Sequence, residues 1–299
     1  MKDELTFTQF EKMCEKYPNR PAIIYLGEKF TYTRLRDLID RFATALNRLG
    51  VRKGDKVMLY ITNSAQWVIS FFAIQKIGAV VVPVAPIYTS FEIEYMINDA
   101  GVETVICLDT NFGYVQEIFS KTGLKRVIVT NLVDLLPIWK RTVGFLFDKV
   151  PGGVVKKSEK VYFFKDLLKQ KPEKLDVSIN PWDDLSYILY TGGTTGVSKG
   201  VMLTHANMSC NVQQLKCWFH DVSEGDGSSM LAIFPFFHSA GFSAIQNMGI
   251  WMGYTLVLVP RPEPGVILEM LKNFKPHFLP AVPTIFVGLL NSPEFRKMD

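Results

Sequence analysis

The sequence of 299 residues has few cysteines and no long apolar run. Its four cysteines, Cys14, Cys107, Cys210 and Cys217, are scattered without a CxxC pair, which argues against a disulfide scaffold and favours a reducing, cytoplasmic setting. Apolar stretches such as Trp67–Ile74 hold about eight residues, whereas a membrane-spanning helix needs about 18 to 20. The amino terminus is charged and amphipathic and lacks the apolar core of a signal peptide. We therefore expect a chain that is soluble or, at most, attached to a membrane surface.

The sequence also has little excess of charge of either sign. The 33 Lys and Arg residues against 29 Asp and Glu residues give a net charge of +4, and no run of like charge is long enough to follow a phosphate backbone. Nucleic acid is therefore not an expected partner. Internal repeats and low-complexity tracts are absent as well. The 48% hydrophobic and 21% charged content supports substantial cores and excludes a disordered chain.

Apolar periodicity predicts alternating strands and helices over the first 130 residues. A helix is expected over 31–50, because its apolar residues recur at spacings of three and four and Gly50 stands where a helix stops. The next expected elements are a strand over 56–62, a helix that starts at Asn63-Ser64 and a strand over 79–84. The same alternation then repeats, with a helix that has a capping-box-like start at Thr89, a strand over 103–108, a helix over 111–121 and a strand over 125–130. This alternation favours a parallel α/β sheet with right-handed crossovers.

Residues 132–181 interrupt the alternation with prolines, Gly152-Gly153 and a lysine-rich stretch. Within them, 135–147 mixes aromatic, aliphatic and basic side chains. An amphipathic helix packed on its own domain is the more common explanation for such a mixture, and contact of 132–150 with a membrane or partner is the alternative. Strands are expected again over 184–190, 228–234, 254–259 and 277–280. We divide the chain into a first α/β subdomain over 1–180, with an irregular excursion at about 131–180, and a second over 181–299.

The most informative segment follows the apolar strand at 185–190. It reads Thr191-Gly192-Gly193-Thr194-Thr195-Gly196-Val197-Ser198-Lys199-Gly200. Its glycines allow backbone N–H groups to converge on an anion, its hydroxyls add donors and Lys199 adds a positive charge, which predicts a phosphate ligand. The spacing is not that of a Walker loop, and 201–204 predicts a short strand, so no helix N-terminus is expected to face the phosphate. A flexible hairpin turn is the alternative interpretation of this composition.

The stretch from Tyr190 to His205 resembles the signature loop of the adenylate-forming superfamily, which includes acyl-CoA synthetases, luciferases and peptide-synthetase adenylation domains. The commoner loop has Ser at position 192 and Pro at position 198. The Gly-Gly form with a small residue before the lysine is most similar to the fatty-acyl-CoA synthetase branch. Segment 234–242 resembles the family's acyl-pocket motif, 281–286 its next strand-to-helix segment and 30–35 its opening hairpin and helix. The resemblance extends from about residue 7 to the end of the chain.

The resemblance implies an adenylate-forming N-terminal domain, with stacked, mostly parallel sheets and flanking helices in αβαβα order, incomplete at its C-terminus. It also implies a fatty-acid–CoA ligase, an acid–thiol ligase. Such enzymes join a carboxylate to ATP as an acyl-adenylate, release pyrophosphate and pass the acyl group to coenzyme A, with Mg²⁺ as the partner of ATP. The implied phosphate-binding residues are Thr191, Gly192, Gly193, Thr194, Thr195, Gly196 and Lys199, with Thr194 and Thr195 as direct ligands.

The resemblance also assigns an acyl site. His238 is the implied catalytic residue, which would orient the carboxylate or gate the pocket, although a lone histidine in an apolar stretch is otherwise most often a core residue. The implied substrate contacts are Phe237, His238, Ser239, Gly241 and Phe242. Small residues stand where peptide-synthetase domains place an aspartate, which disfavours an amino acid substrate. A core stripe and the wall of an apolar tunnel are equally good explanations for the spacing of Phe242, Ile245, Met248 and Trp251.

Several features leave alternatives open. Cys210, Cys217 and His220 have roughly helical spacing but lack a fourth ligand, so no metal site is predicted.

The sequence before Asp299 lacks the motifs with which relatives bind adenine, Mg²⁺ and ribose. It also lacks the domain with their catalytic lysine. The chain is therefore expected to be the N-terminal part of a longer enzyme and inactive alone. A ligase for aromatic or branched carboxylates, a non-catalytic nucleotide- or acyl-binding fragment, and a homodimer remain alternatives.

Overall fold

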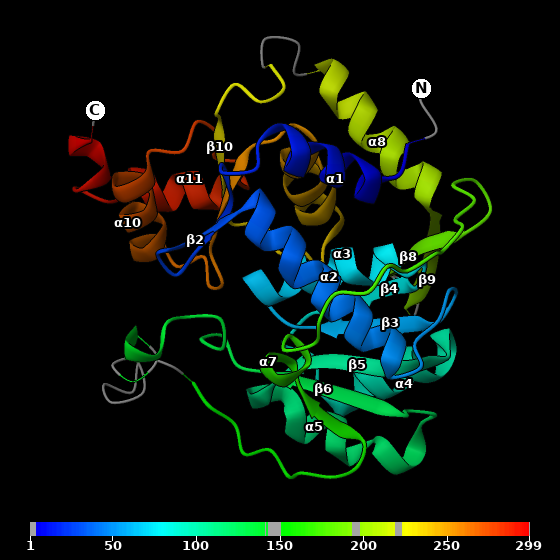
Figure 1. The fold of residues 1–299 in the computed structure, drawn as a ribbon. Helices are drawn as coiled ribbons and strands as arrows, with labels where there is room; N and C mark the ends of the chain where they lie inside the picture. The colour runs from blue at the N-terminus through cyan, green and yellow to red at the C-terminus, as the bar shows by residue number, and fades with distance from the viewer. Residues whose placement is uncertain (1–3, 141, 143–150, 193–197, 219–222, 299) are drawn as a thin grey trace.

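The computed structural model describes residues 4–140, 142, 151–192, 198–218 and 223–298, which form two sheets flanked by helices (Figure 1). The larger sheet has the strand order β7-β6-β5-β3-β4-β8-β9, and its neighbours pair in parallel except for the antiparallel hairpin β8–β9. Its strands are β3 (Lys56–Tyr60), β4 (Val80–Pro83), β5 (Val102–Leu108), β6 (Arg126–Thr130), β7 (Val161–Phe163), β8 (Leu185–Thr191) and β9 (Lys199–Thr204).

The smaller sheet has the order β10-β11-β1-β2 and is parallel except for the hairpin β1–β2. Its strands are β1 (Pro21–Tyr25), β2 (Glu28–Thr31), β10 (Ser229–Ala232) and β11 (Thr255–Leu258). The predicted mostly parallel α/β architecture is therefore confirmed. Both sheets contain strands from before and after residue 180, and the subdomain boundary placed there stays a prediction.

Alternating side chains on the strands show that the two sheets and the helices form five layers. On β3, Val57 and Leu59 face a core between the sheets, and Met58 and Tyr60 face a second core on the outer side. The inner core contains α1 (Thr6–Lys16), α2 (Tyr32–Arg48), α3 (Ala65–Lys76) and α9 (Met248–Trp251). The outer core of the larger sheet contains α4 (Ser90–Ala100) and α5 (Phe112–Glu117). A third core joins the smaller sheet to α10 (Pro264–Phe274) and α11 (Pro283–Leu290), which completes the αβαβα order.

The helix ends follow from local chemistry. Thr31 Oγ1 accepts a hydrogen bond from Arg34 N at 3.1 Å and so caps α2, and Gly50 beyond its last turn has a φ of 85°. Thr89 and Glu92 form a reciprocal capping box at the start of α4, which ends at Gly101 with a φ of 67°. Helix α3 is buried on all sides because it lies between the two sheets, which explains why its residues are mostly apolar.

Two segments differ from the predicted elements. The three-residue strand β7 pairs with β6 inside the predicted excursion, and α7 (Phe164–Leu167) follows it; both are too short to produce a detectable period. The predicted strand at 277–280 is wrong, because only Phe278 bridges to Met230. Pro276 and Pro280 lack the backbone N–H groups that a longer ladder would need. None of the helices in the described ranges combines the length and apolarity needed to cross a membrane.

Candidate functional site

The predicted phosphate loop is carried by the β8–β9 hairpin. Thr191 pairs with Lys199 in the ladder, and Thr191 Oγ1 donates to the Lys199 carbonyl at 3.4 Å. Thr191, Gly192 and Lys199 are exposed. Gly193, Thr194, Thr195 and Gly196 lie outside the described residues. The strand predicted after the loop is confirmed, and no ion pair engages Lys199 within the ranges that the structure describes.

Helix α4 holds the base of this hairpin. Tyr95 Oη donates to the Ser198 carbonyl at 3.0 Å, and Tyr190 Oη donates to Asp99 Oδ2 at 2.5 Å. The two tyrosine rings meet edge to face with their centroids 6.3 Å apart. Burial and the hydrogen bond to Asp99 raise the pKa of Tyr190, so its hydroxyl stays a proton donor. Sequence reasoning missed Tyr95 and Asp99, since helical periodicity does not show which distant strand a helix contacts.

Close backbone packing also fixes the strand that leaves the loop. A Cβ at Gly200 would lie 2.9 Å from Ile188 Cγ2 and 3.3 Å from Tyr190 Cζ. Gly200 therefore lets the Tyr190 ring cover the neighbouring strand. This contact brings the hairpin's two strands together directly below the predicted phosphate-binding residues.

A tight turn after β10 carries the predicted acyl residues. His238 N donates to the Pro235 carbonyl at 3.0 Å, and Ala240 N donates to His238 Nδ1 at 3.3 Å. With Nδ1 accepting this bond, the neutral imidazole carries its proton on Nε2. His238 is exposed, so this Nε2–H can donate to a bound carboxylate. Gly241 has no room for a side chain, because a Cβ there would lie 2.0 Å from the Pro235 carbonyl oxygen.

Four of the five predicted substrate-contacting residues divide between two pockets, and the buried Gly241 borders neither of them. Phe237 and His238 border an apolar pocket of about 330 Å³, whose other walls include Ala281, Val282 and Ile285. The structure thus brings together two segments that are about 40 residues apart. Ser239 and Phe242 border a different pocket of about 610 Å³, against α8 (His205–Trp218). Its lining is more polar, with Asn207, Asn211, Gln214 and Ser243.

The stripe that starts at Phe242 lies mostly in the core. Phe242, Ile245, Met248 and Trp251 are at most 5% exposed, and all four belong to the core between the sheets. They lie on a π-helix over Gly241–Asn247 and on α9. Packing in the core therefore accounts for Ile245 and Met248, whereas Phe242 and Trp251 at the two ends also border pockets.

A third pocket of about 450 Å³ adjoins the apolar one, since Ile233, Pro235 and Phe237 border both. It lies where β3, β5, β10 and β11 end, and ligands of open α/β sheets bind at such carboxyl ends. We call it the polar pocket to distinguish it from the apolar one; its polar lining residues are Thr62, Asn63, Thr110, Asn111, Arg261 and Glu263. Sequence reasoning missed this set, because its members follow three separate strands, β3, β5 and β11.

Tyr187 connects the phosphate hairpin to the acyl segment. Its ring packs against Phe242 with centroids 4.4 Å apart, and its buried hydroxyl donates to the Phe236 carbonyl at 3.4 Å. Tyr187 precedes Thr191 by four residues on β8, which is about 13 Å of strand. One rigid strand therefore carries the start of the phosphate loop and contacts the segment that bears His238.

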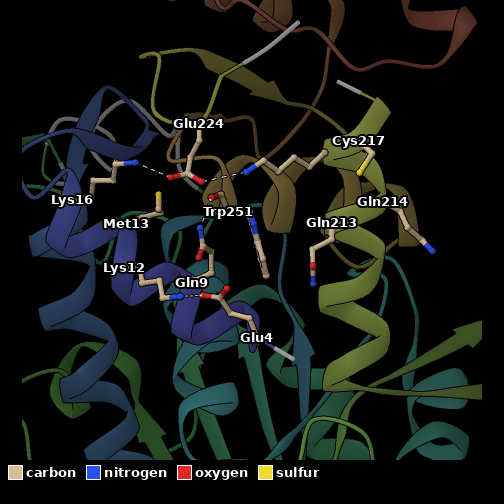
Figure 2. Close-up of a pocket in the computed structure, with 11 residues that line it drawn as sticks. Glu4, Gln9, Lys12, Met13, Lys16, Gln213, Gln214, Cys217, Glu224 and Trp251 are labelled. Carbon is tan, nitrogen blue, oxygen red and sulfur yellow. Dashed lines mark hydrogen bonds and ion pairs between the residues drawn. The ribbon is translucent and has the colours of Figure 1, made fainter. Parts of the chain in front are cut away.

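A larger pocket of about 820 Å³ lies apart from these residues, between α1 and α8 (Figure 2). Glu224 accepts from Lys16 at 2.9 Å and from Lys216 at 3.4 Å, and Lys12 pairs with Glu4. Each of its three lysines is thus paired with one of its two glutamates. It contains none of the predicted site residues.

Metal ligands do not converge in the described part of the chain. No three His, Cys, Asp or Glu side chains there are placed to hold a metal ion, and His220 lies outside the described residues. Cys14 and Cys107 are buried, and burial raises the pKa of the Cys14 thiol to about 12.

Comparisons with known proteins match nearly the whole chain. A family model described as "AMP-binding enzyme" matches residues 10–299. The long-chain-fatty-acid–CoA ligase of Bacillus subtilis (strain 168) is 34% identical over 287 residues, covering 95% of this chain and 51% of the relative. That of Haemophilus influenzae is 32% identical and covers 100% of this chain and 54% of the relative. The crystal structure of a long-chain-fatty-acid–CoA ligase from Archaeoglobus fulgidus superimposes with a TM-score of 0.78 at 27% identity, covering 97% of this chain and 54% of that one.

Proposed function

Because the chain belongs to the AMP-binding enzyme family, we propose that it forms the phosphate-binding and acyl-binding part of a fatty-acid–CoA ligase. The chain spans about half the length of the curated relatives it matches, and the two relatives described above are long-chain-fatty-acid–CoA ligases. The observation that carries the proposal is the apolar pocket at which Phe237 and His238 meet Ala281–Ile285. Tyr187 connects this region to the strand that bears the phosphate hairpin.

The proposed reaction has two steps. A carboxylate oxygen of the fatty acid attacks the α-phosphorus of ATP, the bond to the bridging oxygen breaks and pyrophosphate leaves. The sulfur of coenzyme A then attacks the acyl carbonyl carbon, the thiol gives up its proton and AMP leaves. In the first step an anion must approach a polyanion, so positive and hydrogen-bonding groups at the phosphates are needed.

The phosphate hairpin supplies such groups. Gly192 offers its backbone N–H and Lys199 an ammonium group, and both are exposed at the hairpin. The Thr191 hydroxyl, also exposed, would donate to a phosphate in place of the Lys199 carbonyl. Gly193, Thr194, Thr195 and Gly196 would complete the cradle. These donors stabilise the charge that moves onto pyrophosphate as the bond breaks. Mg²⁺, when bound with ATP, would neutralise part of the same phosphate charge.

His238 would hold the carboxylate of the fatty acid. Its Nδ1 accepts from Ala240 N, which fixes the ring and leaves the Nε2–H group for the substrate. The adjoining apolar pocket would take the acyl chain, and each buried CH₂ group contributes about 0.8 kcal/mol to binding. The polar pocket on the other side of residues 233–237 would give the thiol of coenzyme A a route to the acyl carbonyl.

Acid-dependent exchange of pyrophosphate into ATP tests this function, because it reports adenylation without coenzyme A. We expect exchange that rises with chain length from butyrate to palmitate in a protein that contains this chain. Faster exchange with benzoate or branched acids would favour a ligase for such carboxylates. Binding of ATP and palmitate by calorimetry without exchange would favour a non-catalytic binding role for the 299 residues.

We also propose that the segment around Trp139 contacts a lipid surface in a cytoplasmic protein. Ile138 is 79% exposed and Trp139 is 65% exposed, and Lys140 lies beside the Trp139 ring at 5.4 Å from its centroid. Tryptophan beside a basic residue is typical of an interfacial contact. Flotation with vesicles of phosphatidylcholine and phosphatidylglycerol should be weaker for Trp139→Ala. Equal flotation of the two proteins contradicts the contact. Sedimentation velocity of the same proteins without vesicles tests for a homodimer.

A further inference from the structure

The side chain of Asn63 bridges the two sheets. Asn63 follows β3 and is 4% exposed. Its Nδ2 donates to the carbonyls of Ala232 at 3.1 Å and Phe234 at 2.7 Å, and its Oδ1 accepts from Phe236 N at 2.7 Å. Both donor hydrogens and the acceptor oxygen of the carboxamide are thus engaged with one backbone segment about 170 residues later in the chain.

This segment forms the partition between two pockets. Residues 233–237 follow the end of β10, so the backbone groups of Phe234 and Phe236 have no strand ladder to complete. Asn63 supplies their partners, as buried backbone groups require. Three side chains of this segment, Ile233, Pro235 and Phe237, border both the apolar pocket and the polar pocket, and Phe234 borders the apolar pocket alone. The position of the partition is therefore set by a residue on the other sheet.

The partition in turn places the histidine. The Pro235 carbonyl accepts a hydrogen bond from His238 N at 3.0 Å, and Gly241 packs against the same carbonyl. A displacement of Pro235 would move the His238 ring relative to the apolar pocket. Asn63 thus acts on His238 through two intervening backbone contacts.

We propose that Asn63 is a positioning residue for the acyl site, an inference that rests on the proposed function. Only a carboxamide of this length offers two donors and one acceptor to the three backbone groups. Aspartate would keep the acceptor for Phe236 N but place a carboxylate against two carbonyl oxygens. Alanine would leave all three backbone groups without this partner.

Asn131 provides a matched control. It is also buried, at 9% exposed, and it follows β6 in the same sheet. Its Nδ2 donates to Asp109 Oδ2 at 2.8 Å and to the Pro151 carbonyl at 3.0 Å, and its Oδ1 accepts from Val133 N at 3.1 Å. It borders neither the apolar nor the polar pocket. Asn131→Ala therefore removes the same number of hydrogen bonds at comparable burial, away from the acyl site.

The experiment compares wild type, Asn63→Ala and Asn131→Ala by hydrogen exchange and by calorimetric binding of palmitate and of ATP. In Asn63→Ala we expect the amides of 232–242 to exchange about tenfold faster and palmitate to bind about tenfold more weakly, with ATP affinity within about twofold of wild type. Asn131→Ala should leave all three quantities within about twofold. If Asn63→Ala does not fold, Asn63→Asp should show the same selective loss of palmitate affinity.

Unchanged exchange over 232–242 in Asn63→Ala, or unchanged palmitate affinity, overturns the positioning role. An equal loss of palmitate and ATP affinity also overturns it, because general destabilisation would explain that result. A wild type that binds ATP but no fatty acid overturns the proposed function and the acyl role of Asn63 with it. Hydrogen exchange still decides in that case whether Asn63 holds the partition.

Discussion

The Tyr95 hydroxyl donates a hydrogen bond to the Ser198 carbonyl at 3.0 Å, which ties helix α4 to the residue that re-enters the sheet after the phosphate loop. Asp99, one turn further along α4, accepts from Tyr190 on the strand that enters the loop. The helix therefore holds both ends of the loop from outside the sheet. Because a loop closes at lower entropic cost when its ends are fixed, this contact should assist phosphate binding.

Tyr95→Phe should weaken the binding of ATP. The substitution removes one hydroxyl and keeps the ring that packs against Tyr190, so we expect about a three- to tenfold higher Kd for ATP with palmitate affinity unchanged. Isothermal titration calorimetry measures both constants. Tyr114→Phe on α5, at 40% exposed, is the control for loss of a tyrosine hydroxyl. Equal ATP affinity in wild type and Tyr95→Phe would contradict a role for α4 in holding the loop.

The stability of the fold should decrease in mild acid because of His205. This side chain is 1% exposed at the start of α8, and burial lowers its pKa to about 4. The unfolded chain takes up a proton near pH 6.5 and the folded chain does so only near pH 4. The free energy of unfolding therefore falls as the pH drops from about 6.5 towards 4, by about 1.4 kcal/mol per pH unit.

Urea unfolding at pH 7 and pH 5 tests this dependence. We expect wild type to lose about 2 kcal/mol between these two pH values through His205. His205→Gln cannot titrate, so its loss should be smaller by that amount whatever its stability at pH 7. Equal pH dependence of the two proteins would mean that His205 is protonated as readily in the folded state as in the unfolded one.

The four cysteines should differ in reactivity. Cys14 and Cys107 are buried, and burial raises the pKa of both thiols, whereas Cys210 is partly exposed and Cys217 is exposed. Since the thiolate is the reactive species, Ellman's reagent should modify two thiols in the native protein and all four in guanidinium chloride. Cys217→Ser should remove the faster of the two native reactions. Modification of a third thiol under native conditions would contradict the burial of Cys14 or Cys107.

Local signals allowed much of the fold to be predicted. The helix at α2, the capping box of α4 and the strands on either side of the phosphate loop are specified by residues within a few positions of one another. The contacts that shape the candidate site are long-range. The start of a helix at Asn63-Ser64 is confirmed, because Ser64 caps α3, but the sequence does not reveal that Asn63 bonds to a segment on the other sheet. Periodicity does not specify which distant backbone a buried polar side chain will reach.

Two glycine-to-alanine substitutions should have opposite effects on stability. Gly241→Ala would place a Cβ 2.0 Å from the Pro235 carbonyl oxygen, so the turn that carries His238 must move. We expect a loss of about 1–3 kcal/mol in the free energy of unfolding together with weaker palmitate binding. Gly288 lies within α11, and a Cβ there meets no atom within 4 Å. Gly288→Ala should therefore stabilise the fold by up to about 1 kcal/mol, because alanine is the better helix former.

Urea unfolding of the two variants, with palmitate titrations in parallel, measures these effects. Because both variants add a single methyl group, hydrophobicity and volume do not separate them; only the local backbone environment does. A Gly241→Ala protein as stable as wild type would mean that the Pro235 carbonyl can shift at little cost. In that event the turn would not depend on the close approach of Gly241 to the Pro235 carbonyl, and the placement of His238 through Pro235 would lose its structural basis.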